Sequence, residues 1–131
     1  MSLDELRRSP TMRHLLDALN QGKDIGHYGR LTFAMAAHNF LDKEELAKVL
    51  QKGKGADEQE IHALVQQVED RDYNPPSRQR ILEWQKKQDF QICPKEEDPN
   101  ACNLYQELNL PEEVFENIEQ YRDQQYEATT D

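Results

Sequence analysis

The sequence predicts an all-α fold, a compact bundle of five or six short helices. Apolar residues recur at three- and four-residue spacing, which is the period of a helix with one buried face. Cap residues and glycines stand at the ends of these periodic segments. No segment alternates polar and apolar residues as a strand does. We therefore expect helices along most of the 131 residues.

The first predicted helix begins at Ser9-Pro10. A serine side chain accepts from the free amides of a first turn, and proline is tolerated there because no donor is needed. One apolar face follows before Gly22, made of Met12, Leu15, Leu16 and Leu19. The next helical segment, residues 31–41, is apolar on nearly all sides. It is the candidate for the central core helix.

Two capping boxes predict the third and fourth helices. Asp42 with Glu45, and Asp57 with Glu60, place a cap acceptor three residues before a carboxylate. An apolar stripe follows each box: Leu46, Val49 and Leu50 after the first, and Ile61, Leu64, Val65 and Val68 after the second. These segments are predicted to be consecutive short helices.

Prolines divide the rest of the chain. Pro75-Pro76 breaks the helical pattern because proline lacks an amide donor, and Ser77 is a ready N-cap for a fifth helix. The pattern weakens over residues 88–103, which are expected to form a loop. Pro111 is expected to open a last amphipathic helix with acidic residues on its outer side.

The charge of the chain is unevenly distributed. The formal net charge is −10, but residues 1–90 carry 14 basic and 15 acidic side chains, whereas residues 91–131 carry two basic and eleven acidic ones. We therefore expect a helical domain over residues 1–102 and an acidic C-terminal helix and tail over residues 103–131. Such a tail repels phosphate backbones, and it either stays solvated or contacts a basic partner.

Several classes of protein are excluded at this stage. No apolar stretch is long enough to span a membrane, and the charged first ten residues do not resemble a secretory signal, so a cytoplasmic protein without a membrane partner is expected. No glycine-rich phosphate cradle, nucleophile elbow or catalytic acidic motif is present. The sequence therefore does not predict an enzyme.

Metal sites are not predicted either. The four histidines, which are His14, His27, His38 and His62, do not have the spacing of a zinc motif. Cys93 and Cys102 lack a second cysteine pair, and a reducing cytosol would keep them as free thiols. We therefore expect no cofactor; the alternative is an iron–sulfur cluster or metal at these two cysteines.

The segment from Gly26 to Arg30 is the candidate binding element. It brings His27, Tyr28 and Arg30 together just before a predicted helix. Arg30 and the helix amides could hold a phosphate, while an aromatic ring stacks on a base. The alternative is a structural loop whose arginine pairs with a carboxylate.

The order of the short motifs resembles a known family. The motifs are Ser9-Pro10-Thr11-Met12-Arg13-His14-Leu15, His27-Tyr28-Gly29-Arg30-Leu31-Thr32-Phe33, Glu44-Glu45-Leu46-Ala47, Tyr73-Asn74-Pro75-Pro76-Ser77, Cys93-Pro94 and Cys102. In order and spacing they are similar to the C-terminal iron–sulfur domain of the large subunit of archaeal and eukaryotic DNA primase. The resemblance spans about residues 9–102.

The resemblance implies a degenerate iron–sulfur site. Thr11 and Arg78 stand where the family has two cluster cysteines, and Cys93 and Cys102 look like the other two. Arg78 would then be a structural replacement that needs a carboxylate or carbonyl partner, because an unpaired buried charge is costly. In order of preference, the two remaining thiols simply pack, close a disulfide if oxidised, or bind metal across a dimer.

The resemblance also implies a function. In the family this domain is not catalytic and helps the catalytic subunit to bind template and initiating nucleotide. The expectation here is an accessory module of DNA replication that binds nucleic acid or a nucleotide 5′-triphosphate through His27, Tyr28 and Arg30. Its partner would be a primase-type catalytic subunit or another protein. The alternative is a protein-interaction adaptor that uses the acidic C-terminal helix and binds no nucleic acid.

Overall fold

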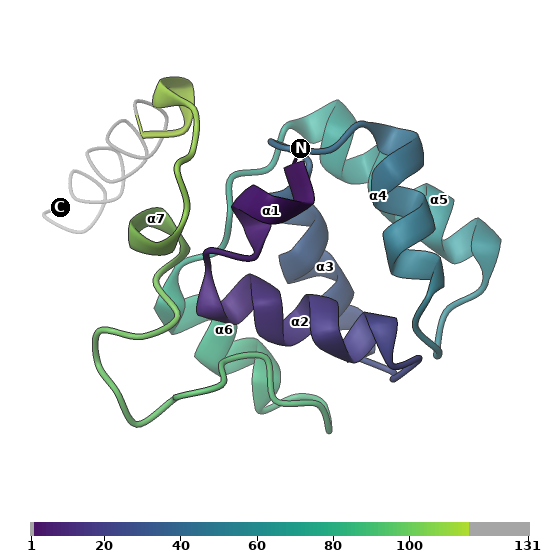
Figure 1. Cartoon of the computed structure of the whole chain (residues 1–131). Coiled ribbons are helices and arrows are strands. Elements are labelled where there is room, and N and C mark those ends of the chain that lie inside the picture. Colours follow the sequence, from purple (N-terminus) through teal and green to yellow (C-terminus); the bar gives the residue numbers. More distant parts are fainter. Residues whose placement is uncertain (1, 116–131) are drawn as a thin grey trace, which may run out of the picture.

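The predicted all-α fold is confirmed. A computed structural model describes residues 2–115, within which there are helices and no strand (Figure 1). The helices are α1 (Ser2–Leu6), α2 (Pro10–Asn20), α3 (Gly26–Ala37), α4 (Lys43–Gln51), α5 (Glu58–Arg71), α6 (Arg78–Gln85) and α7 (Leu104–Glu107). None of the helices in this range is long and apolar enough to cross a membrane.

The helix starts follow the predicted caps. The side chains of Ser9, Asp42, Asp57 and Ser77 each accept a hydrogen bond from the backbone N–H three residues further on. Each bond satisfies an amide that the first turn of a helix leaves without a partner. At Asp42 the same bond from Glu45 stabilises the charged carboxylate and lowers its pKa below the usual value. Local sequence therefore determines where α2, α4, α5 and α6 begin.

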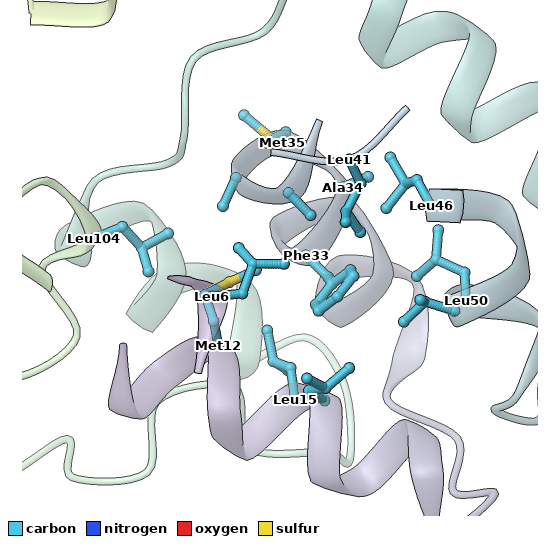
Figure 2. Close-up of a cluster of buried hydrophobic side chains, with 14 of the residues drawn as sticks. Leu6, Met12, Leu15, Phe33, Ala34, Met35, Leu41, Leu46, Leu50 and Leu104 are labelled. Carbon is cyan, nitrogen blue, oxygen red and sulfur yellow. The ribbon is translucent and has the colours of Figure 1, made fainter. Parts of the chain in front are cut away.

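Helix α3 is the centre of the fold, as its apolar sequence predicts. It packs against α2, α4, α5 and α6, and Phe33 on it is fully buried. Figure 2 shows Phe33 among side chains from both ends of the chain. The labelled members of this cluster are Leu6, Met12, Leu15, Phe33, Ala34, Met35, Leu41, Leu46, Leu50 and Leu104. The last six residues of α3, 32–37, are all buried, so the C-terminal half of this helix lies within the core.

Two short helices were not predicted. Helix α1 contributes Leu6 and α7 contributes Leu104 to the core, and both side chains are fully buried. The carboxylate of Glu107 on α7 accepts hydrogen bonds from the Ser9 hydroxyl at 2.6 Å, the Thr11 amide at 3.2 Å and the Thr11 hydroxyl at 3.3 Å. The α7 segment is thus held to the first turn of α2, a contact between distant parts of the chain that the local sequence does not reveal.

The first part of the expected acidic segment packs against the helical domain. Between residues 103 and 115, where the described part of the chain ends, the buried apolar residues are Leu104, Leu108, Leu110 and Val114. They extend the core although their neighbours are rich in acidic residues. The remainder of the predicted last helix and tail, residues 116–131, lies outside the described residues.

Removal of the central ring tests the role of α3. We expect Phe33→Ala to lower the free energy of unfolding by about 3–5 kcal/mol, because it removes apolar contacts and leaves a cavity. Phe115→Ala is the matched control, since Phe115 is 41% exposed and its truncation removes far less buried surface. Urea denaturation followed by circular dichroism measures both losses. Equal losses would contradict a core centred on α3.

Candidate functional site

Helix α3 begins earlier than the sequence predicts. Its first residue is Gly26, so His27, Tyr28 and Arg30 lie in the first turns of the helix rather than in a preceding loop. Gly26 has a φ of +77°, a conformation that glycine adopts without strain. The turn is fixed by the Asp24 carboxylate, which accepts from the Gly26 amide at 2.8 Å. Glycine permits this early start, because the backbone must turn sharply before the helix.

The side chain of Gln88 fastens this helix start to the segment after α6. Its Oε1 accepts from the Tyr28 amide at 3.0 Å, and its Nε2 donates to the carbonyls of Ile25 at 2.9 Å and Phe90 at 3.0 Å. A Cβ on Gly26 would lie only 2.3 Å from Gln88 Oε1. Gln88 therefore occupies an amide of the first turn that was expected to hold a phosphate, and it positions Tyr28 beside α6.

Arg30 pairs with a carboxylate, as the structural alternative predicts. Its Nη1 donates to Asp24 Oδ1 at 3.1 Å and to the Lys54 carbonyl at 3.3 Å. The residue is 9% exposed, so the ion pair lies at the edge of the core. Among the described residues, no hydrogen-bond partner is found for its Nη2 or Nε. Arg30 thus joins two loops and keeps donors for a further acceptor.

A groove lies between the start of α3 and helix α5. It has a volume of about 270 Å³. Its lining residues are His27, Arg30, Ala56, Glu60, Ile61, Ala63, Leu64 and Gln67. The guanidinium and imidazole come from α3, whereas α5 contributes a carboxylate, an amide and apolar side chains. The groove therefore offers both donors and acceptors above an apolar floor.

An aromatic surface adjoins this groove. Tyr28 stacks on Trp84 of α6, with ring centroids 5.5 Å apart and an interplanar angle of 25°. The His27 and Tyr28 rings form a T-shaped pair, with ring centroids 5.3 Å apart. Lys87 Nζ lies 5.9 Å from the centre of the Tyr28 ring, and the Arg80 guanidinium lies 5.9 Å from that of Trp84. We call these five residues the aromatic surface; His27 belongs both to it and to the groove.

The residues that α6 and the segment after it contribute to this surface were not predicted from the sequence. Trp84, Arg80 and Lys87 are distant in sequence from the glycine-flanked segment that was singled out. A signal was nevertheless present, because residues 78–88 carry four basic side chains against a single acidic one, Glu83, and include the one tryptophan of the chain. An aromatic residue within a locally basic helix is a feature of surfaces that bind nucleic acid.

Arg78 has the carbonyl partners that its charge requires. Its Nε donates to Ala101 O at 3.0 Å, and its Nη2 donates to Glu96 O at 2.8 Å and Asp98 O at 3.1 Å. All three carbonyls belong to the loop between the cysteines. Arg78 therefore fastens that loop to the first turn of α6.

The expectation of free thiols at Cys93 and Cys102 is wrong in this structure. The two residues are joined by a disulfide, with a Cα–Cα distance of 5.6 Å, and both are buried. The loop turns back on itself, with Cys102 in a left-handed backbone conformation at φ 65°, so the two sulfurs meet. Sequence spacing alone left this pairing as the second of three alternatives.

The residues at these positions do not fit an iron–sulfur cluster. Thr11 directs its amide and hydroxyl to Glu107, Arg78 is bonded to carbonyls, and both cysteine sulfurs are shared in the disulfide. Over residues 2–115, no group of three or more His, Cys, Asp and Glu side chains is arranged to hold a metal ion. Thr11 and Arg78 are thus structural residues here.

No protein-family model matches this chain, and no curated protein and no solved structure matches it either. The chemistry of the groove and of the aromatic surface is therefore the basis for assigning a function. Cationic side chains, stacked rings and a groove with polar edges and an apolar floor meet at the start of α3.

Two glycine substitutions test how tightly Gln88 positions the start of α3. Gly26→Ala and Gly22→Ala both place an alanine at positive φ, +77° and +73°, which costs about 1 kcal/mol of stability. Only at Gly26 does the new Cβ meet Gln88, whereas at Gly22 the nearest atom lies 3.9 Å away. We expect Gly26→Ala to lose a further ~1–3 kcal/mol as Gln88 gives up its bonds.

Urea denaturation measures the two losses, and near-ultraviolet circular dichroism reports the Tyr28–Trp84 stack. The stack signal should weaken in Gly26→Ala and persist in Gly22→Ala. Equal losses of stability with an unchanged stack signal in both variants would contradict this role of Gln88.

Proposed function

We propose that this protein is a non-catalytic accessory module that binds nucleic acid or a nucleotide through the aromatic surface and the adjoining groove. The single observation that carries the proposal is the stack of Tyr28 on Trp84 with a cation against each ring. The resemblance to the primase large subunit supports the same function, because it assigns binding to His27, Tyr28 and Arg30. Replication is the process in which such a module would act.

The rings and the cations of the aromatic surface differ in burial. Tyr28 and Trp84 are half-buried, so their rings are held by packing, whereas Arg80 and Lys87 are exposed on long side chains. A base can displace either cation from its ring, and the displaced cation is then free to pair with a phosphate. Base stacking contributes about 1–3 kcal/mol per base and tolerates any base identity. The surface thus suits an unpaired base with a phosphate beside it.

The groove offers complementary contacts. Arg30 is already oriented by Asp24 and Lys54, so little conformational entropy is lost when its remaining donors bind a phosphate oxygen. His27 lies between the groove and the stack. Glu60 lines the same groove and repels phosphate, but its carboxylate accepts from a sugar hydroxyl or a base amino group. A nucleotide, with both charged and neutral polar parts, matches this mixture.

The charge distribution limits the kind of binding. A chain of net charge −10 repels a nucleic-acid backbone at long range, so it cannot coat DNA non-specifically. The local excess of basic residues over 78–88 attracts phosphate at one place only. We therefore infer recognition of a single strand, a strand end or a nucleotide rather than binding along a duplex.

Binding can be measured through Trp84, the one tryptophan of the chain. We expect a short single strand, or a duplex end that carries a 5′-triphosphate, to quench its fluorescence at 50–100 mM salt, where phosphate contacts still register. Tyr28→Ala should weaken binding by roughly 5- to 100-fold because a stacking ring is lost. Lys87→Gln should weaken binding less and reduce the slope of affinity against salt concentration.

Lys48→Gln is the matched control, since it removes the same charge from an exposed position on α4. It should leave affinity unchanged. The proposal fails if the unmodified protein gives no quenching with any of these ligands, or if Lys48→Gln weakens binding as much as Lys87→Gln. Binding to a protein partner without nucleic acid, lost on deleting residues 103–131, would instead favour the adaptor function.

A further inference from the structure

The cysteine loop is held shut in two independent ways. The Cys93–Cys102 disulfide joins its ends across a sequence separation of 9. Arg78 of α6 donates to three carbonyls within the loop, those of Glu96, Asp98 and Ala101. The disulfide is covalent, and its presence depends on redox conditions. The hydrogen bonds of Arg78 do not depend on redox conditions.

A second residue of α6 reinforces the loop. Gln85 Oε1 accepts from the Cys93 amide at 2.8 Å, and Gln85 Nε2 donates to Glu96 Oε2 at 2.6 Å. Arg78 and Gln85 lie at the two ends of α6. The first and last residues of α6 therefore both bind the loop.

The disulfide is shielded from solvent although its loop is not. Cys93 is 0% and Cys102 1% exposed, whereas residues 95–100 between them are all exposed. Thiol–disulfide exchange requires a thiolate to reach one of the two sulfurs directly. A reductant therefore cannot attack while the loop is closed. The loop must open, and the bonds from Arg78 oppose that opening.

We propose that Arg78 controls the reduction of the Cys93–Cys102 disulfide by holding the loop closed, so that a dithiol reaches the sulfurs only when the loop opens. In the exchange, one thiolate of a dithiol attacks a cysteine sulfur, the sulfur–sulfur bond breaks, and a mixed disulfide forms. The second thiolate of the dithiol then displaces the remaining cysteine. Two electrons and two protons pass to Cys93 and Cys102, and the dithiol leaves as its cyclic disulfide.

The hydrogen bonds of Arg78 also determine the position of the loop after the disulfide is reduced. The three bonds of Arg78 go to backbone carbonyls and do not involve sulfur. They persist after reduction, so the loop stays on α6 and the two thiols remain buried. The chain can thus change its redox state without unfolding this region. Arg78 and the two cysteines belong neither to the aromatic surface nor to the groove, so reduction of the disulfide can be tested separately from nucleic-acid binding.

The rate of reduction tests the role of Arg78. Oxidised full-length protein is mixed with dithiothreitol, quenched at intervals with a thiol-alkylating reagent and weighed by intact mass spectrometry. Since attack follows opening, the rate is proportional to the population of the open loop. We expect Arg78→Gln to be reduced roughly tenfold faster or more, because three hydrogen bonds from a charged donor are lost. Arg71→Gln, which removes an exposed arginine of α5, should match the unmodified protein.

Arg78→Lys makes the test robust if Arg78→Gln does not fold. A lysine keeps the charge but cannot span three carbonyls as the planar guanidinium does, so its rate should also exceed that of the unmodified protein. Hydrogen exchange of amides 93–102 should be similar in the oxidised and reduced unmodified protein. Unchanged reduction rates in both Arg78 variants, failure of the two cysteines to pair under oxidising conditions, or a freely exchanging loop after reduction would each overturn the proposal.

Discussion

The burial of α3 is the constraint on which the rest of the structure depends. Four other helices pack against it, and Phe33 occupies the middle of the core that results (Figure 2). A helix enclosed in this way has little freedom to shift along or around its axis, because interiors are densely packed. Its first turn is the part that emerges from the core. His27 and Tyr28 are consequently presented on a rigid base, with Arg30 beside them at the edge of the core, and a rigid base is what a binding surface requires.

Two arginines, Arg30 and Arg78, each fasten a loop to a helix through hydrogen bonds from the guanidinium group. Arg30 and Arg78 each bring a guanidinium close to the core, and each satisfies it with oxygen atoms from neighbouring loops. The planar, multi-donor head group can join several acceptors at once, which a lysine cannot do. Such side chains order the loops through hydrogen bonds to backbone carbonyls and a carboxylate, where apolar packing does not. Arg30 also lines the groove and can contact a ligand there, whereas Arg78 donates to the loop between the cysteines.

The sequence predicted the helices well where the signals are local. Ser9, Asp42, Asp57 and Ser77 cap helices because the cap bond is made within three residues, and the apolar stripes follow the helical period. Contacts between distant segments were not predictable in this way. The contact of Glu107 with α2, the insertion of Gln88 beneath the start of α3, and the stacking of Tyr28 on Trp84 depend on tertiary packing. The candidate site was therefore predicted in part: the sequence pointed to its α3 residues, but not to those of α5, of α6 and of the segment after α6.

The overall charge of −10 is a poor guide to what one surface of this chain can bind. Screening by salt limits the reach of a charge to about 10 Å at 0.1 M ionic strength, so distant acidic residues matter less than those beside the ligand. Near the aromatic surface, basic side chains of α6 outnumber acidic ones, while Glu60 in the groove admits neutral polar groups. Long-range repulsion then opposes unspecific contacts without abolishing a specific one. An acidic protein with one basic aromatic surface is suited to selective rather than tight binding, because the weak general attraction leaves recognition to stacking and to a few directed hydrogen bonds.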